Sequence, residues 1–429
     1  MNKTSSGLSR TVTRIEADLL IPGRGEPIKN GCVVFDHGTI AFAGSIEDAP
    51  NAAKGAPTVS VPVLMPGMWD VHGHFMGIRT PDIAEVTRTP VAVMAGRVVR
   101  DAERALHAGF TSVREVGGFG VFLSRIVDEG TVPGPHIYGA GSALSVTGGH
   151  GDFHSLPLPF VLDLSKIAGI SVLCDGVPEC LKAVRQQLRV GAKAIKVLAS
   201  GGVMSEVDHP THQQFSDEEL RAIVEEAARA DRVVAAHCHG KPGMMAALKA
   251  GVKTIEHGTY LDDEVVELLR DREAILVPTE FILERLVAFA KGGGVPDYAV
   301  PKAVAVAERH KIALALAIRS NVRIAVGTDI WMSGDSGMAT WGMNGNEVMC
   351  LVEAGMAPLR AIEAATANGP PTLGPQAPKS GQLVEGYDAD AIALAQSPLK
   401  DIGVLATPER VTHVWKAGTF VKSPSVSSA

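Results

Sequence analysis

The 429-residue sequence contains few cysteines, and those few are scattered along the chain. There are five of them, an odd number, and no two form a Cys-x-x-Cys pair. This pattern argues against a disulfide framework and against a zinc site built from cysteines. A chain with free, scattered cysteines suits a reducing compartment, so we expect a cytoplasmic protein.

An excess of positive charge and long apolar runs are also lacking. Forty Lys and Arg residues against 47 Asp and Glu give a formal net charge of −7, which argues against a nucleic-acid partner or a polybasic membrane surface. No apolar run approaches the ~18 residues of a membrane span, and the amino-terminal residues lack the apolar segment of a secretory signal. The sequence has no Gly-Lys-Ser or Gly-Lys-Thr triplet, so a phosphate-binding P-loop is not expected.

Short apolar, β-branched runs alternate with stretches of helical periodicity through the middle of the chain. The runs cover residues 64–71, 112–116, 136–140, 194–198, 233–237, 254–257, 274–277 and 323–326. The main helical stretches cover residues 91–107, 179–190, 218–230, 243–250 and 302–319. Strand alternating with helix eight times predicts an α/β fold of the (β/α)8 TIM-barrel type, with an open doubly wound sheet as the alternative.

The two ends of the chain differ from the middle. Both show β-like alternation broken by turn pairs such as Pro22-Gly23 and Asn30-Gly31. Neither end alone has enough strands for a stable sheet. We therefore predict one small β-sandwich domain formed from residues 1–63 and 378–429, beside a barrel formed by residues 64–377.

Two histidines, His72 and His74, stand at the end of the first predicted barrel strand. Side chains at positions i and i+2 of a strand face the same side, so the two imidazoles can converge on one ion. The pair alone is weak evidence, because the sequence has 14 histidines. Its position strengthens the case, since barrel strands deliver their last residues to the catalytic mouth.

Three further potential ligands occupy equivalent positions. His237 ends the fifth run, His257 ends the sixth, and Asp329 follows the eighth. Residues at the ends of separate strands can meet only if the sheet closes into a barrel. There they would form a metal site of imidazole and carboxylate ligands.

Lys196 lies in the middle of the fourth apolar run. A buried lysine is costly unless it is paired or neutralised. One interpretation is an ion pair at the rim of the barrel. The other is an amine carboxylated by CO2, which becomes an anion able to bridge two metals.

Together these residues resemble the amidohydrolase superfamily, in its subtype with two divalent metals. His72, His74, Lys196, His237, His257 and Asp329 fill all six ligand positions of that family. The resemblance implies two divalent ions, with zinc expected, and N6-carboxylation of Lys196. We assign one ion to His72, His74 and Asp329 and the other to His237 and His257, with carboxylated Lys196 between them. A bridging hydroxide would attack the substrate, and Asp329 would act as catalytic base and then acid.

A finer resemblance points to amidases similar to Xaa-Pro dipeptidases and to ochratoxin hydrolases. It rests on four stretches, at residues 147–152, 200–205, 212–216 and 257–260. These relatives release a carboxyl-terminal amino acid from an acyl group, so the expected partner is a small amide or peptide. His150 and Tyr260 are candidate catalytic and substrate-binding residues, and His239 is a candidate substrate contact. Each has a plainer alternative as a loop, packing or supporting residue. The family also leads us to expect a homo-oligomer.

Two alternatives remain at the level of function. The same hydroxide would serve to hydrolyse a cyclic amide, a lactone or a phosphoester. A non-catalytic binding protein on the same scaffold is the other alternative, although such relatives tend to lose metal ligands, and here all six positions are filled.

Overall fold

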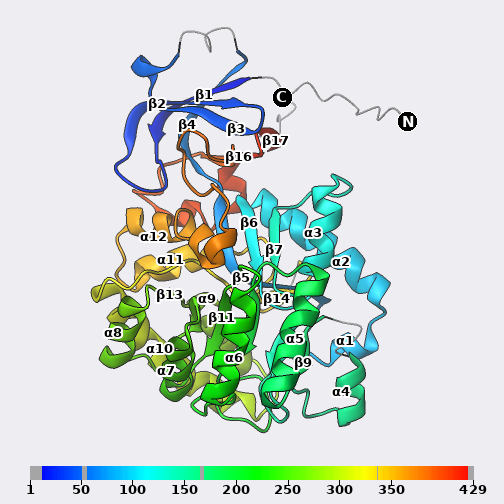
Figure 1. The fold of residues 1–429 in the computed structure, drawn as a ribbon. Helices are drawn as coiled ribbons and strands as arrows, with labels where there is room; N and C mark the ends of the chain where they lie inside the picture. The colour runs from blue at the N-terminus through cyan, green and yellow to red at the C-terminus, as the bar shows by residue number, and fades with distance from the viewer. Residues whose placement is uncertain (1–11, 51–55, 165–168, 336, 424–429) are drawn as a thin grey trace.

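The computed structural model describes residues 12–50, 56–164, 169–335 and 337–423. Figure 1 shows a barrel of strands surrounded by helices, with a separate sheet stacked against one end of it. The predicted α/β barrel with a β domain from both termini is confirmed. Residues 1–11 and 424–429 of the predicted terminal domain lie outside the described residues. The division at residues 63 and 378 stays a prediction.

The barrel strands run parallel to one another. In chain order they are β5 (Met68–Ile78), β6 (Phe110–Glu115), β7 (His136–Gly139), β8 (Ala143–Ser145), β10 (Ile195–Leu198), β11 (Val234–Cys238), β12 (Thr254–His257) and β13 (Ile275–Val277). β7 and β8 together occupy the place of the third predicted strand. The eighth predicted strand pairs through an isolated bridge between Leu276 and Ile324. The sheet closes where Val71 N donates to Val326 O at 2.8 Å.

Helices cover the outside of the barrel. They are α2 (Val91–His107), α3 (Gly120–Asp128), α5 (Gly176–Val190), α6 (Asp217–Ala228), α7 (Lys241–Ala250), α8 (Asp263–Asp271), α9 (Glu280–Lys291), α10 (Ala299–Arg319), α11 (Asn346–Glu353) and α12 (Pro358–Ala365). Smaller elements lie in the connecting loops: α1 (Glu85–Arg88), α4 (Leu158–Leu164), β9 (Ser171–Leu173) and β14 (Ile330–Met332). α6 begins with the capping box that Ser216 and Glu219 predict. Among the described residues, no helix combines the length and hydropathy of a membrane-spanning segment.

Seven strands from the two ends of the chain form the second sheet. They are β1 (Thr13–Leu20), β2 (Ile28–Asp36), β3 (Thr39–Ser45), β4 (Thr58–Pro66), β15 (Ala391–Leu394), β16 (Val411–Lys416) and β17 (Thr419–Lys422). β15 pairs with β4, so strands far apart in sequence complete one sheet. The sheet curls over its own core, because Phe35 on β2 meets Trp415 on β16 edge to face at 6.3 Å.

The boundary of the first predicted barrel strand, residues 64–71, is wrong. The chain ends β4 at Pro66, turns at Gly67 and starts β5 at Met68, so the apolar run belongs to both sheets. A Cβ atom on Gly67 would lie 2.0 Å from Thr111 Oγ1, so glycine is required at the crossing. β5 starts beside the terminal sheet and continues to Ile78, so His72 and His74 lie in the middle of this strand and not at its end as predicted.

Candidate metal centre

The first imidazole pair lies beside a carboxylate. Nε2 of His72 is 3.4 Å, and Nε2 of His74 is 3.0 Å, from Oδ1 of Asp329. Burial alone would raise the pKa of Asp329, but the two rings outweigh it and hold that pKa well below its usual range. The group therefore presents two imidazole nitrogens and an ionised carboxylate, a ligand set that suits a divalent ion.

The opposite nitrogens of the same rings are held by acceptors. Nδ1 of His72 lies 2.8 Å from Oε2 of Glu256, and Nδ1 of His74 donates to the carbonyl of Gly117 at 2.8 Å. A carboxylate or carbonyl oxygen accepts a hydrogen bond from the N–H at Nδ1, which leaves the lone pair on Nε2. This is the tautomer that a metal ligand needs.

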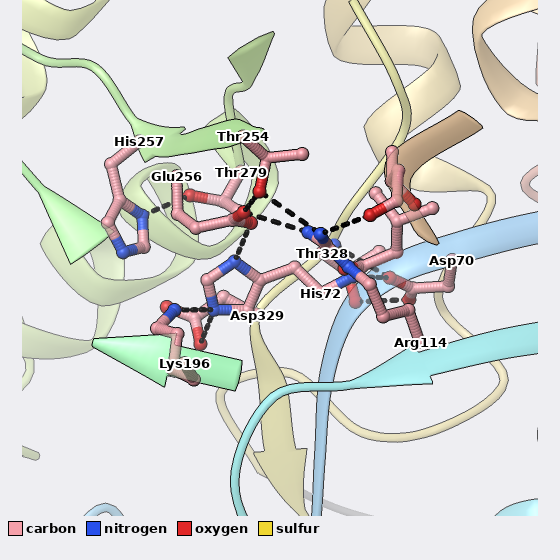
Figure 2. A network of polar contacts seen from close by, with 12 residues as sticks. Asp70, His72, Arg114, Lys196, Thr254, Glu256, His257, Thr279, Thr328 and Asp329 are labelled. Carbon is pink, nitrogen blue, oxygen red and sulfur yellow. Dashed lines mark hydrogen bonds and ion pairs between the residues drawn. The ribbon is translucent and has the colours of Figure 1, made fainter. Parts of the chain in front are cut away.

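A buried ion pair supports His72 from behind, as Figure 2 shows. Nη2 of Arg114 lies 2.8 Å from Oε1 of Glu256, and Nε of Arg114 donates to the carbonyl of Val71. Burial would raise the pKa of Glu256, but Arg114 and His72 lower it more, so the carboxylate stays charged. Sequence reasoning missed both residues. The available signal was a charged side chain inside each of two apolar strands.

Asp70 fixes the backbone beside the candidate carboxylate ligand, Asp329. It accepts hydrogen bonds from the N–H of His72 at 3.0 Å, from the N–H of Thr328 at 3.1 Å and from the amide of Asn344 at 2.7 Å. It therefore ties β5 to the loop that carries Asp329. Asp70 orients the main chain around the two histidines and does not bond to their rings.

The structure places Lys196 next to the same group. Its Nζ atom lies 3.5 Å from Nε2 of His72, and the residue is only 2% exposed. Burial lowers the pKa of the amine to about 8, although Glu256 and Asp329 oppose that shift. A lysine with this pKa has far more neutral amine near neutral pH than an exposed lysine, and the neutral form is the one that reacts with CO2.

A second imidazole group faces the first across the mouth. One ring nitrogen from each of His237, His239 and His257 lies within 4.8 Å of the others. Nδ1 of His257 is 2.7 Å from Oγ1 of Thr279, and Nε2 of His237 donates to the carbonyl of Gly201 at 3.2 Å. Burial lowers the pKa of His237 and His257 well below the usual range, so both rings are neutral, as metal ligands must be.

Two of the candidate ligands and one neighbouring residue have left-handed backbones. The φ angles are 68° for His257, 57° for Asp329 and 56° for Thr279. Such angles cost on the order of 1–3 kcal/mol for residues other than glycine and concentrate at functional sites. The strain turns the last residue of β12 and the residue after the eighth strand toward the mouth.

The two groups open into one cavity of about 140 Å³. His150 and His239 line the cavity together with the six predicted ligands. The ring of His150 stacks on that of His237, with 4.4 Å between the ring centroids, and its Nδ1 atom is hydrogen-bonded to Oγ of Ser205. Tyr260 is not among the lining residues; its ring lies 5.9 Å from the guanidinium of Arg309. The remaining wall is mostly apolar and includes Met76, Val116, Phe153, Ile170, Leu198, Ile282, Leu286 and Trp331.

A parallel barrel with two imidazole-rich donor groups at the carboxyl ends of its strands has the architecture of a metal-dependent hydrolase. A family model described as "Amidohydrolase family" matches residues 63–421. The chain therefore belongs to the amidohydrolase family and is a hydrolase that acts on amide bonds.

Individual relatives agree with this assignment. The chain is 45% identical to a protein named ochratoxinase from Aspergillus niger, over 97% of this chain and 88% of that protein. The crystal structure of A. niger ochratoxinase superposes with a TM-score of 0.90 at 44% identity, covering 97% of this chain and 96% of that one. A Xaa-Pro dipeptidase with bound methionine in its active site matches at 30% identity with a TM-score of 0.84, covering 96% and 100% of the two chains.

Proposed function

We propose that this enzyme is a dinuclear metal amidase that releases a carboxyl-terminal amino acid from an N-acyl amino acid or peptide, including amides of the ochratoxin type. The observation that carries the proposal is the convergence of six candidate ligand side chains, from four strands and the segment after the eighth predicted strand, on one mostly apolar cavity. The relatives, an ochratoxinase and a Xaa-Pro dipeptidase, support the same kind of substrate.

Two donor sets fit two divalent ions, for which we propose zinc. His72, His74 and Asp329 would hold one ion, and His237 and His257 the other, with carboxylated Lys196 shared between them. The fit rests on the hydrogen bonds that Nδ1 of His72, His74 and His257 already makes, because they leave Nε2 of each ring for an ion. When bound, the ions supply a water acidic enough to act as nucleophile at neutral pH and polarise the amide carbonyl.

Asp329 then serves as the proton carrier. Its carboxylate is ionised and faces the position between the two imidazoles of β5. It takes the proton released when water attacks the amide carbon and returns it to the leaving nitrogen. One side chain thereby acts as base and then as acid.

The other polar residues of the cavity would bind the substrate. His150 and His239 both line it, and burial lowers the pKa of each, the latter to about 3, so both remain neutral at working pH. A neutral imidazole that donates through one nitrogen suits the scissile carbonyl or the substrate carboxylate. A contact with Tyr260 would require a substrate that extends beyond the lining residues of the cavity.

The apolar wall would select the rest of the substrate. Phe153, Ile282, Leu286 and Trp331 surround the space above the donor groups. Burying an apolar side chain against such a wall contributes about 1.5–3 kcal/mol. We therefore expect bulky apolar or aromatic groups on either side of the scissile amide to be preferred over charged ones.

A substrate panel tests the proposal. The zinc-loaded enzyme is incubated with N-acyl amino acids, Xaa-Pro dipeptides and ochratoxin A, and released amino acid is measured. A cyclic amide, a lactone and a phosphotriester are included for comparison. We expect amino-acid release that is lost on chelation and restored by zinc. Hydrolysis confined to the comparison compounds, or no bound divalent metal in CO2-replete buffer, would contradict the proposal.

A further inference from the structure

The segment that follows β10, residues 201–208, forms part of the cavity wall although it is neither a helix nor a strand. Its residues Val203 and Met204 line the cavity. The backbone of Gly202 lies against the ring of His150, because a Cβ atom on this glycine would be 2.0 Å from Cε1 of that ring. The position of the segment therefore sets the shape of the cavity beside a candidate substrate-binding residue.

This part of the wall lacks main-chain hydrogen bonds. In the described part of the chain, residues 202–208 make no hydrogen bond between their own main chain and another main-chain group. Buried main-chain polar groups need partners, and both Gly202 and Ser205 are buried. Side chains must therefore supply these partners and hold the segment in place.

A single lysine supplies partners for three of the carbonyl groups. Nζ of Lys302, near the start of α10, donates to the carbonyl oxygens of Ser205 at 2.8 Å and Asp208 at 2.6 Å. It also donates to the carbonyl oxygen of Gly202 at 3.3 Å. An ammonium group has three hydrogens, so these three acceptors use all of them. Because the side chain is only 15% exposed, water competes little for the same hydrogens.

The carboxylate of Asp208 ties the segment together from within. Its Oδ2 atom accepts hydrogen bonds from the N–H of Gly202 at 3.1 Å and from the amide of Gln214 at 2.8 Å. Its Oδ1 atom accepts the hydroxyl of Ser205 and lies 3.6 Å from Nζ of Lys302. The ammonium group thus meets both the carbonyls of the segment and a negative charge that belongs to it.

The other contacts of the segment lie nearer the surface. The hydroxyl of Tyr298 donates to the carbonyl of Met204 at 3.1 Å, and the N–H of Val207 donates to Nδ1 of His154 at 3.4 Å. Tyr298 and Val207 are both exposed, so water can replace these bonds. Loss of Lys302 would therefore leave the segment without its main buried anchor.

We propose that Lys302 is a positioning residue that holds residues 201–208 against the cavity, so that Val203 and Met204 form a fixed apolar wall for the substrate. The inference rests on the proposed function for the identity of the molecule that meets this wall. Binding is weakened when a loop must first be ordered, and a preformed wall avoids that loss. Lys302 contacts this segment and not the candidate metal ligands, so its removal should weaken substrate binding more than the chemical step.

Hydrogen–deuterium exchange of the zinc-loaded enzyme tests whether Lys302 holds the segment. K302M keeps most of the side-chain length and removes the ammonium group. We expect peptides that cover residues 201–208 to exchange about tenfold faster in K302M than in the wild type, with β10 and β11 unchanged. K311M removes a more exposed lysine from the same helix and should leave the segment unchanged.

Exchange at the wild-type rate in K302M would overturn the inference. This measurement needs no substrate, so it decides whether Lys302 holds the segment even if the substrate panel shows the proposed function to be wrong. If K302M does not fold, D208N takes its place, because it removes the charge that faces Lys302. D208N should also speed exchange in residues 201–208, and wild-type exchange in that variant would contradict the inference.

Kinetics with N-benzoylphenylalanine test the effect on the substrate. We expect K302M to raise KM by about tenfold while kcat changes by less than about threefold, the pattern for loss of binding that is equal in ground and transition states. K302A should behave in the same way, and added n-propylammonium should lower its KM again, whereas n-propanol should not. Bound zinc should stay at the wild-type level in both variants. Unchanged KM, or a fall in kcat with loss of zinc, would overturn the inference.

Discussion

Nδ1 of His72 lies 2.8 Å from a carboxylate oxygen of Glu256, whose other oxygen lies 2.8 Å from Arg114. All three side chains are almost completely buried. Figure 2 shows this line of contacts leading from the centre of the barrel to the nitrogen that faces Asp329 and Lys196. The opposite charges of Arg114 and Glu256 compensate each other inside the barrel. The same carboxylate fixes the ring of His72, which we propose as a metal ligand.

Substitution of Glu256 should therefore affect stability and metal affinity separately. E256Q leaves Arg114 as a buried, unpaired cation and should destabilise the fold by about 3–5 kcal/mol. It should also lower zinc affinity by about 10–100-fold, because His72 loses the carboxylate that orients it. Urea unfolding and competition with a chelator measure the two effects.

The double variant E256Q/R114M separates them further. Removing both charges should restore much of the stability but none of the zinc affinity. Recovery of both together would show that Glu256 acts only through the fold and not through His72.

Lys196 should be needed for activity as a carboxylated side chain. K196A should lower kcat/KM by about 100-fold or more, because the anion shared by the two ligand groups is lost. Added short-chain carboxylates should restore part of the activity by occupying the vacated space. K182A, at an exposed position on α5, should show neither effect. Unchanged activity in K196A would exclude the bridging role.

Asp329 should control turnover more than folding. D329N should reduce kcat by about 10²–10⁴, the range for loss of a general acid–base group. Circular dichroism and the unfolding midpoint should change little, because the backbone at this position is held by Asp70 and Thr328. The assay is run in saturating zinc, with bound metal measured. Turnover close to that of the wild type would remove Asp329 as the proton carrier.

Glu115, which is not itself a proposed metal ligand, predicts a pH dependence of stability. The carboxyl is fully buried, and burial raises its pKa from the usual 4.5 to about 8 despite nearby backbone N–H groups. Between pH 4.5 and about 8, the carboxyl group of Glu115 is protonated in the folded state and ionised in the unfolded state. This group's contribution to the free energy of unfolding is therefore complete below pH 4.5 and falls as pH rises toward 8, by up to about 1.4 kcal/mol per unit.

E115Q should remove this loss while keeping the size of the side chain. Urea midpoints of wild type and E115Q, measured across the same pH range, should diverge in favour of E115Q as pH rises. Parallel curves would mean that Glu115 is ionised in the folded protein or that its pKa is close to normal.

The sequence alone was sufficient for the class of fold and for the placement of the candidate ligands. Strand and helix periodicity are local properties, so the alternation through residues 64–330 predicted the barrel. The position of His237 and His257 at the ends of β11 and β12 followed from the same pattern, whereas His72 and His74 lie in the middle of the longer β5. The first strand was misplaced because one apolar run serves two sheets, and only the pairing of β4 with β15 shows where it divides.

Strand and helix periodicity could not identify the residues that support the candidate ligands. Arg114 and Glu256 are separated by 142 positions, so no local sequence pattern links them. Tyr260 lies close to His257 in sequence but is not among the residues that line the cavity, so its role stays a prediction.

Local periodicity and residue type thus determined which side chains reach the mouth of the barrel, because each strand orients its own residues. Only the closed tertiary structure decided which of them touch and which carboxyls are buried. It also decided which imidazole nitrogens face the cavity. Distances between strands, dehydration and the direction of hydrogen bonds depend on groups from many parts of the chain at once.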